Sequence, residues 1–392
     1  MAMTEYMTPG VYVEELAMAH RQIAGVPTAT AAFLGVAGAG PFGAVAEPVR
    51  SLAEYERLCE PGGAAPELPD GNGSSVPNFL WHAVRAFFVE GGQRLVVVRL
   101  PMERRLDPAA WAAGLVELES IGEVGLVAAP GSRWRYPEHR DAADRIADLL
   151  VAHAERMRHR VALLDGGEGQ SVAEVIAMRE RLDSRRAALF HPWVVVADPV
   201  GGGTLALPPS AFVAGLCART DAQRGVHQAP ANEVVRLAVD LAARLTDAEQ
   251  ARLNPLGINC IRRFPDRGIR LWGARTLARD TAWTHLAITR FVAYLERSIE
   301  TGLGWAVFEP NGEPLWAAVR QSIDHFLTSE WRSGALAGLR ADAAFFVRCD
   351  RTTMTQHDVD TGRLVCLVGV APLKPATFEI LRIEVRTGGP GP

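Results

Sequence analysis

The first candidate for chemistry is the glycine-rich turn Gly38-Ala-Gly40-Pro-Phe-Gly43, which directly follows an apolar run. This GxGxxG spacing after a strand is the pattern of a dinucleotide site. Such a site needs an uninterrupted helix whose N-terminus faces the pyrophosphate, and Pro41 and Pro48 lie in or near its first turns. We therefore interpret the segment as a glycine-rich turn and expect no nucleotide cofactor.

A hydrolytic site would need a nucleophile, a base and an acid that orients the base. Asp165 and Asp198 each follow an expected strand, and Ser210 stands at an expected helix start in Leu-Pro-Pro-Ser. No histidine stands in a recognisable motif beside them, and the sequence contains no GxSxG. Aspartates after strands usually cap helices or turns, so we predict that the chain is not an enzyme and keep a subtilase-like hydrolase as a remote alternative.

Metal binding finds little support in the sequence. His153 and His159 are six residues apart on an expected helix, which places them on different faces. The chain has five widely spaced cysteines and no CxxC pair: Cys59, Cys217, Cys260, Cys349 and Cys366. This pattern indicates neither a disulfide framework nor a zinc site, and it fits a reducing compartment. We expect no metal and no cofactor.

The elements that would position these residues follow from hydrophobic patterning along 392 residues, of which 48% are apolar and 22% charged. Length predicts two or three domains, or one core with large insertions, and the composition is that of a globular protein. In the middle of the chain, apolar runs alternate with amphipathic segments, which predicts an α/β fold with a parallel sheet covered on both faces. The expected strands are 30–36, 95–100, 124–128, 161–164 and 193–197, and the expected helices are 78–89, 141–158 and 172–182.

From about residue 250 the pattern changes to long helices with many tryptophans, so the overall class is α+β. One helix is expected over 281–301 with Asp280 as its N-cap, and a second begins at Pro314 and ends before Gly334. The segments 344–348 and 364–370 are expected to be strands.

Both ends of the chain predict strands outside the packed core. Near the N-terminus, a β-prone run with acidic residues behind it follows a Pro-Gly turn and indicates a strand on a free arm: Val11, Tyr12, Val13, Glu14 and Glu15. A second strand is expected after Pro375, and its apolar positions are Phe378, Ile380, Leu381, Ile383 and Val385, with the last three on one face. Each such strand needs a sheet to join.

Charge gives limited information about partners. The net charge of −4 argues against a protein that coats nucleic acid. The first basic residue is Arg21, so we expect no signal peptide. The uncharged run 22–46 is broken by Pro27 and Pro41, so we expect a buried strand and a loop rather than a membrane span.

One segment is strongly basic. Residues 251–290 hold eight arginines against two aspartates, a local net charge of +6, whereas residues 1–20 carry −3. A solvated face, a nucleic-acid surface and an interface for an acidic segment, such as this chain's own arm from a neighbouring copy, all remain open. The interface hypothesis rests on Arg262, Arg263, Arg267 and Arg270.

Several blocks resemble the sheath proteins of contractile phage tails and related injection particles. The longest are Leu207-Pro-Pro-Ser-Ala-Phe through Ala229-Pro-Ala-Asn232, and Asn254-Pro-Leu-Gly-Ile-Asn through Trp272-Gly-Ala-Arg-Thr-Leu277. Shorter ones are Pro9-Gly-Val-Tyr-Val-Glu-Glu15, Val307-Phe-Glu-Pro-Asn311 and Gly369-Val-Ala-Pro-Leu-Lys-Pro-Ala376. The resemblance therefore spans nearly the whole chain.

The resemblance implies a division of the chain and a subtilisin-like α/β middle domain without a catalytic triad. The implied parts are an N-terminal linking arm (1–20), the first part of an inner domain (21–75), an outward α/β domain (76–250), a C-terminal inner domain (251–374), and a C-terminal strand arm and tail (375–392). The terminal arms would add strands to the sheets of neighbouring subunits.

The implied function is mechanical. Hexameric rings would stack into a helical sleeve around an inner tube, and the sleeve would contract to drive the tube through a target envelope. The expected partners are further copies of the chain, the tube protein, and baseplate and terminator or cap proteins, with no nucleic acid and no membrane insertion. Assembly would occur in the bacterial cytoplasm, within a phage tail or tail-like particle. The alternative is a minor sheath paralogue or a scaffold or cap at the baseplate.

Overall fold

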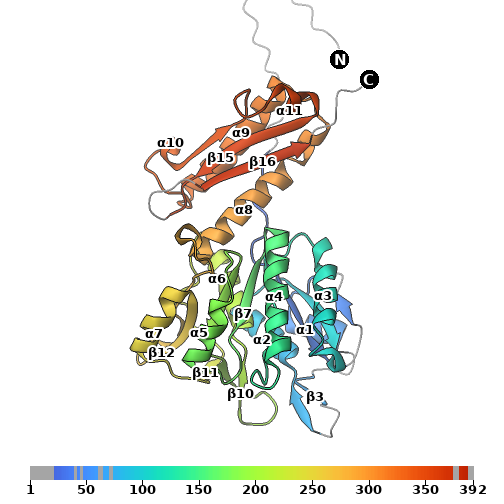
Figure 1. The fold of residues 1–392 in the computed structure, drawn as a ribbon, viewed down its shortest axis with the longest axis vertical. Coiled ribbons are helices and arrows are strands. Elements are labelled where there is room, and N and C mark those ends of the chain that lie inside the picture. The colour runs from blue at the N-terminus through green and yellow to red at the C-terminus, as the bar shows by residue number, and fades with distance from the viewer. Residues whose placement is uncertain are drawn as a thin grey trace, which may run out of the picture.

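The chain folds into two packed units. The structure is a computed structural model, and it describes residues 22–38, 42–44, 47–60, 65–69, 74–373 and 379–386. The larger unit, coloured blue to yellow, contains the main sheet, and the smaller unit is orange to red (Figure 1). Helix α8 (Leu286–Gly302) runs between them. Helices make up 42% and strands 23%, so the predicted mixed α/β class is confirmed.

The larger unit is built on an eight-stranded sheet with the order β13-β12-β8-β7-β6-β1-β5-β2. Neighbours from β12 to β5 pair in parallel, while the edge strands β2 and β13 pair antiparallel. The strands are β1 (Ala31–Ala37), β2 (Gly43–Ala44), β5 (Leu95–Pro101), β6 (Leu126–Ala128), β7 (Val161–Asp165), β8 (Ala187–His191), β12 (Ile258–Phe264) and β13 (Gly268–Leu271). Their near-continuous apolar sequences are explained by burial on both faces.

Helices cover both faces of this sheet and make it the middle of three layers. One face packs against α1 (Leu52–Cys59), α2 (Phe79–Glu90) and α6 (Ser210–Arg224). The other packs against α3 (Pro108–Glu117), α4 (Arg140–Met157), α5 (Val172–Glu180) and α7 (Asp247–Leu253). The predicted α2 is confirmed, since Asn78 accepts the Trp81 N–H at its start and Gly91 ends it with a left-handed φ of 119°.

One predicted strand lies in a different sheet. The run 193–197 forms β9 (Val194–Ala197), which pairs antiparallel with β10 (Thr204–Leu207) and β11 (Ala238–Leu241). Its place in the parallel sheet is taken by β8, which the sequence analysis missed. The apolar run is nearly continuous from residue 187 to 197, and Pro192 divides it, so the pattern alone could not show which half joins the sheet. A further hairpin consists of β3 (Glu67–Pro69) and β4 (Ser75–Pro77).

The uncharged run 22–46 contains an extended segment and β1, not a membrane span. No helix in the described ranges is both long and apolar enough to cross a bilayer. After the glycine-rich turn, Gly43 and Ala44 form β2, and the next helix, α1, begins only at Leu52. No described helix therefore opens at the turn, as a dinucleotide site would require.

The smaller unit packs two long helices against a three-stranded sheet with the order β14-β15-β16. Its strands are β14 (Phe345–Arg348), β15 (Arg363–Val370) and β16 (Glu379–Arg386), and its helices are α8, α9 (Glu313–Arg332), α10 (Ala341–Ala344) and α11 (Gln356–Asp360). The helix expected over 281–301 is divided, because Asp280 caps a 3-10 turn, η4 (Thr281–Trp283), and α8 begins three residues later. Pro314 lies in the first turn of α9, as predicted.

The division of the chain differs from the predicted one. Strand β1 precedes residue 75 and strands β12 and β13 follow residue 250, yet all three belong to the eight-stranded sheet. The predicted boundaries after residues 75 and 250 therefore fall inside the larger unit. A sheet collects strands from distant parts of the chain, and the local change in pattern near residue 250 does not mark where the unit ends.

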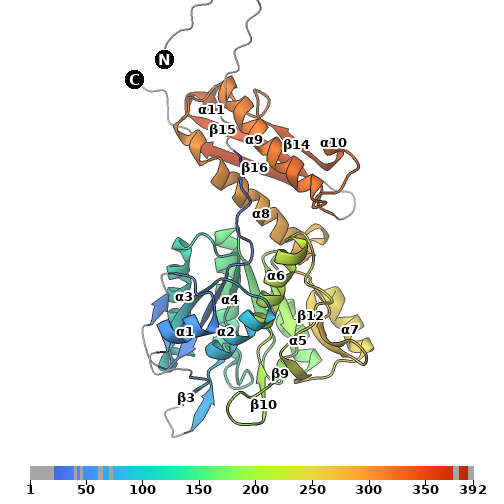
Figure 2. The ribbon, with the colours of Figure 1, turned by 180° about the vertical axis from the view of Figure 1, so that it is seen from behind.

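Two chain segments cross between the units. The first, which we call the strap, is the extended segment 22–30, and Figure 2 shows it in dark blue descending beside α8. Its Ile23 is buried in the core of the smaller unit. The second crossing leads from Leu277 into α8, whose Leu286 packs in the core of the larger unit while Leu295 and Ile299 pack in that of the smaller.

Candidate subunit-contact surfaces

The predicted C-terminal strand is β16, an edge strand of the smaller unit's sheet within the described part of the chain. It pairs with β15 of its own chain over eight residues, with Ile380 opposite Gly369, Leu381 opposite Val368 and Val385 opposite Leu364. Ile383 is 3% exposed and lies in the core of the smaller unit. Phe378 is outside the described residues.

The acidic N-terminal strand cannot be placed in this structure. Val11, Tyr12, Val13, Glu14 and Glu15 precede Gln22 and lie outside the described residues. The strap is the first part of the chain that the structure describes, and two hydrogen bonds hold it in place. Val26 N donates to Ser298 Oγ of α8 at 3.1 Å, and Thr28 Oγ1 donates to Asp221 Oδ2 at 2.5 Å.

Two of the predicted interface arginines pair with acidic residues of their own chain. Arg262 Nη2 lies 2.7 Å from Asp247 Oδ1, and Arg263 Nη2 lies 3.2 Å from Asp240 Oδ1. Backbone hydrogen bonding by Leu241 and the nearby guanidinium groups hold the pKa of Asp240 below its usual value, so the partner of Arg263 is charged at neutral pH.

The other two arginines lie at the β12–β13 hairpin. The Arg267 guanidinium packs over the rings of Phe264 at 4.5 Å and Trp272 at 5.3 Å. Arg270 donates from Nη1 to the Asn232 carbonyl at 2.6 Å and from Nε to the Arg267 carbonyl at 2.8 Å. Of the four arginines, this pair makes no carboxylate contact within the described residues and so keeps its charge available to a partner.

The eighth arginine of the basic segment does not contribute to a surface. The side chain of Arg290 on α8 is 3% exposed, and its Nη1 and Nη2 lie 2.9 and 2.6 Å from the two carboxylate oxygens of Asp221 on α6. Burial opposes the charge, but Asp221 outweighs it and raises the pKa of Arg290. The bidentate pair joins the two units, and the sequence analysis missed it because no local pattern links residues 69 positions apart.

A cavity of about 550 Å³ lies beside this joint. It is bordered by the strap, the end of α6, and Tyr294 and Glu330 of the smaller unit. Tyr294 Oη donates to Glu330 Oε1 at 2.8 Å, and burial raises the pKa of Glu330. A Cβ on Gly25 would stand 2.3 Å from Tyr294 Oη, so a larger residue at this position would require the Tyr294 ring to move.

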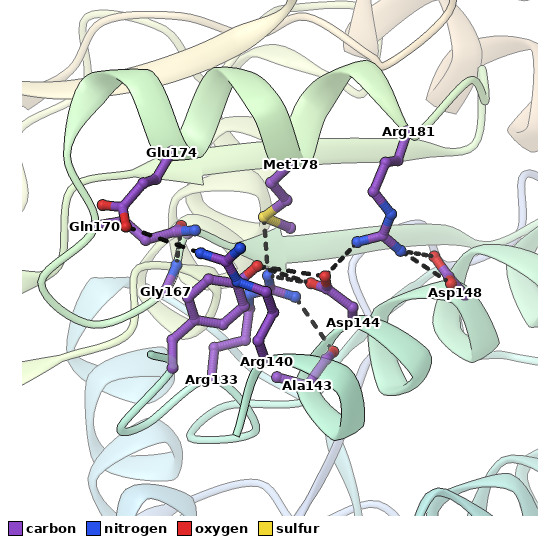
Figure 3. A network of polar contacts seen from close by, with 12 residues as sticks. Arg133, Arg140, Ala143, Asp144, Asp148, Gly167, Gln170, Glu174, Met178 and Arg181 are labelled. Carbon is purple, nitrogen blue, oxygen red and sulfur yellow. Dashed lines mark hydrogen bonds and ion pairs between the residues drawn. The ribbon is translucent and has the colours of Figure 1, made fainter. Parts of the chain in front are cut away.

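A second polar network stabilises the outer helices of the larger unit (Figure 3). Asp144 of α4 binds two guanidinium groups: Arg133 Nη2 lies 2.8 Å from Oδ1, and Arg181 Nη1 contacts Oδ2. Arg133 also donates to the Met178 sulfur of α5 at 3.0 Å, and its side chain is 2% exposed. The network fixes α4 and α5 to the loop after β6.

The structure brings together two members of the hypothetical triad, Asp165 and Ser210, but buries both. Ser210 N and Oγ donate to the two carboxylate oxygens of Asp165 at 2.7 and 2.8 Å, and Ser210 is 0% exposed. Burial raises the pKa of Asp165 to about 7. The carboxylate binds the serine directly, so the pair anchors the start of α6 and offers no surface to a substrate. Asp198 lies in an exposed turn, where it accepts the Val200 N–H.

The two histidines have separate partners. His153 Nε2 lies 2.7 Å from Nη1 of the buried Arg160, and His159 Nε2 lies 3.0 Å from Glu300 Oε2 on α8. Within the described segments, no group of three potential metal ligands occurs.

Large apolar side chains are exposed on the smaller unit. Phe308 is 89% exposed at the end of η5 (Gly304–Phe308), which contacts β16, and Leu339 is 99% exposed between α9 and α10. Single exposed apolar side chains are ordinary on protein surfaces, so these two residues alone do not define a contact surface.

Family models match two adjoining parts of the chain. Residues 123–277 match the phage tail sheath protein central domain, and residues 278–386 match the phage tail sheath C-terminal domain. Their meeting point, after Leu277, coincides with the second crossing between the two units.

Known proteins match over most of the chain. A protein of Pseudomonas aeruginosa (strain UCBPP-PA14) described as a prophage major tail sheath protein is 27% identical over 305 residues, which is 74% of this chain and 77% of that protein. The contracted helical sheath of the anti-feeding prophage (AFP) is 32% identical with a TM-score of 0.75 and covers 97% of this chain and 99% of its own. A chain of the six-fold symmetrised AFP baseplate is also 32% identical, with a TM-score of 0.74, and the match covers 97% of this chain and 99% of that chain.

Proposed function

This chain belongs to the phage tail sheath protein family, a family of structural sheath subunits of contractile injection systems, and we propose that its copies form a sleeve of hexameric rings around an inner tube. Contraction of the sleeve would drive the tube through a target envelope. The observation that carries this proposal is the end-to-end similarity to a sheath subunit in its contracted state. Six-fold symmetry in the AFP baseplate supports rings of six.

The proposed links between subunits are donated β-strands. In the isolated chain, β16 occupies the edge of its own sheet through eight paired residues. The same strand from a neighbouring copy could make the same hydrogen bonds to β15, and the acidic arm 1–20 could extend the sheet further. About four backbone hydrogen bonds at roughly 0.5–1.5 kcal/mol each give a few kcal/mol per link, and many links in a closed lattice make it persistent.

The roles of the two units are part of the proposal. The smaller unit, with the strand-accepting sheet, would lie inward beside the tube, and the larger α/β unit would face outward. We propose the tube protein, baseplate and terminator or cap proteins as further partners. Assembly would occur in the bacterial cytoplasm.

Deleting residues 1–20 is expected to abolish sheath formation by the purified chain. The full chain should form regular hollow tubes visible by negative-stain electron microscopy, because each copy can donate its arm to the next. The truncated chain should stay monomeric, since it lacks the predicted N-terminal strand but retains both cores. Matching circular dichroism spectra and melting temperatures of the two chains would show that the fold is unchanged.

A different result would redirect the proposal. Tubes of equal length from the truncated chain would show that the arm does not link subunits. If both chains stay monomeric even at high concentration, the second candidate function, a baseplate-associated sheath paralogue, is favoured. The similarity to a chain of the AFP baseplate is the observation that supports this candidate.

Reversing the charge of Arg267 and Arg270 with glutamate is expected to raise the protein concentration needed for tubes by about tenfold or more. Both side chains lie at the β12–β13 hairpin and make no carboxylate contact in the described part of the chain, so an acidic segment of a neighbour can pair with them. We propose that such pairs are exchanged on contraction. The measurement is tube mass by sedimentation across a concentration series, followed by microscopy of the contracted fraction.

The matched control reverses Arg57 of α1 and Arg145 of α4, which are exposed elsewhere on the larger unit and, within the described residues, form no ion pair. The control should assemble as the unmodified chain does. Equal assembly and contraction by both double variants would show that the basic hairpin is not part of the subunit interface.

A further inference from the structure

Two of the five cysteines stand opposite each other in the sheet of the smaller unit. Strands β14 and β15 pair antiparallel, and their last pair at this end is Arg348 with Leu367. One further step in the same register places Cys349 opposite Cys366. The other three cysteines lie in the larger unit, in α1, α6 and β12.

The two thiols also point to the same side of the sheet. Phe345 and Val347 share a face of β14 with Cys349, and their partners Val370 and Val368 share a face of β15 with Cys366. Cys349 and Cys366 are 1% and 0% exposed and belong to the same hydrophobic core. A hydrogen bond between the two side chains, together with burial, raises the pKa of the Cys366 thiol. The sulfur atoms are therefore neighbours.

We propose that Cys349 and Cys366 form a modification site, a dithiol that a small-molecule disulfide such as oxidised glutathione converts to an intramolecular disulfide. One cysteine thiolate attacks the glutathione disulfide, forms a mixed disulfide and releases one glutathione thiol. The second cysteine then attacks the mixed disulfide, which forms the protein S–S bond and releases the second glutathione. The two cysteine protons end on the two glutathione thiols, so atoms and electrons balance.

The geometry favours this pair over any other in the chain. Residues directly opposite in an antiparallel pair have Cβ atoms about 4.5–5.5 Å apart, and a disulfide needs about 3.5–4.5 Å, so a small local shift closes the bond. The bond would close the segment 350–365, which contains α11 and the turn where Thr353 Oγ1 donates to the Val365 carbonyl at 2.8 Å.

Burial determines how the reaction proceeds. A buried thiol with a raised pKa is mostly protonated and out of reach of a dissolved oxidant. Oxidation of the folded chain therefore requires opening of the segment 350–362 and should accelerate at higher pH. Refolding in a glutathione buffer removes this barrier, because the bond can form before the core closes.

The test is a thiol count on the full chain. The reduced, denatured protein is refolded in buffer containing reduced and oxidised glutathione, quenched with acid, and desalted in acid to remove the glutathione. Its remaining thiols are then titrated with Ellman's reagent after renewed denaturation. We expect the count to fall from five thiols to three. Tryptic mapping without reduction should recover the peptides containing Cys349 and Cys366 joined, with a mass two hydrogens below their sum. Five free thiols, or a different joined pair, would overturn the proposal.

Three variants separate this pair from general oxidation. Cys349→Ala and Cys366→Ala should each keep all four remaining thiols, whereas the matched control Cys260→Ala should fall from four to two. The tryptic peptide map of the unmodified chain identifies the joined cysteines even if a variant does not fold. The oxidised chain should also show a higher denaturation midpoint than the reduced chain, since the bond restricts the unfolded state.

Discussion

Replacing Asp221 with alanine is expected to lower the free energy of unfolding by about 3–5 kcal/mol. The Asp221–Arg290 pair is almost completely buried, with side-chain exposures of 7% and 3%, and both oxygens of the carboxylate are engaged. Without the carboxylate, the Arg290 guanidinium stays buried, with the Thr28 carbonyl at 3.3 Å as a remaining acceptor. The cost is therefore that of an uncompensated buried charge.

Denaturant unfolding of three variants measures this effect. Asp342→Ala is the matched control, because its pair with Arg340 is 66% and 80% exposed and should contribute less than about 1 kcal/mol. The double variant Asp221→Leu with Arg290→Met removes both charges and should recover much of the loss. A cost for Asp221→Ala as small as that of the control would show that the pair does not hold the two units together.

Acidification from pH 6.5 towards pH 4 is expected to destabilise the fold by several kcal/mol. His82, His153 and His191 are 1–2% exposed, and burial lowers the pKa of each to about 4. Their pKa in the unfolded chain is about 6.5. Below that pH the unfolded chain binds protons that the folded chain excludes, so stability is present above pH 6.5 and is lost as the pH falls.

Asp165 acts in the opposite direction over the same range. Burial raises its pKa to about 7, so the folded chain keeps a proton that the unfolded chain loses above about pH 4. Its contribution to stability is present below pH 4 and is lost as the pH rises through 7. For these four groups alone, three histidines against one aspartate leave a net uptake of about two protons on unfolding, or about 2.7 kcal/mol per pH unit. Burial also raises the pKa values of Glu60, Glu90 and Glu330, so these carboxyl groups act in the same direction as Asp165 and reduce the total slope.

The histidine contribution can be isolated at His191, whose two ring nitrogens have no hydrogen-bond partner among the described residues. His191→Leu should reduce the slope of stability against pH by about one proton, or roughly 1.4 kcal/mol per pH unit. The exposed His325, changed to leucine, is the control and should leave the slope unchanged. Urea midpoints at pH 7, 6 and 5 provide the slopes, and equal slopes for both variants would contradict the assignment.

A helix could be predicted from the sequence where its own segment contains the capping residues and the hydrophobic pattern that define it. The cap at Asn78, the stop at Gly91 and the apolar face between them define α2 without help from the rest of the chain. Sheet membership was not predictable in this way. The runs on either side of Pro192 look alike, and only packing of the whole unit decides that β8 joins the parallel sheet and β9 does not.

The contact surfaces show the same limit. The basic character of residues 251–290 was visible in the sequence, but the partners were not. Arg262 finds Asp247, and Arg290 finds Asp221, because the fold brings distant segments together. Counting charges in a window therefore overstated the free charge of this surface. The assignment of Val11–Glu15, Arg262, Arg263, Arg267, Arg270, Phe378 and β16 to subunit contacts stays a prediction.

Helix α8 has a mechanical consequence. Its 17 residues give a rod about 25 Å long, and the hydrophobic side chains of its two ends are embedded in different cores. A flexible linker would let one unit rotate without moving the other, whereas a continuous helix resists bending and twisting. The strap adds a second, parallel attachment that further limits torsion. A force or torque applied to the smaller unit is therefore transmitted to the larger unit with little relative movement between the two.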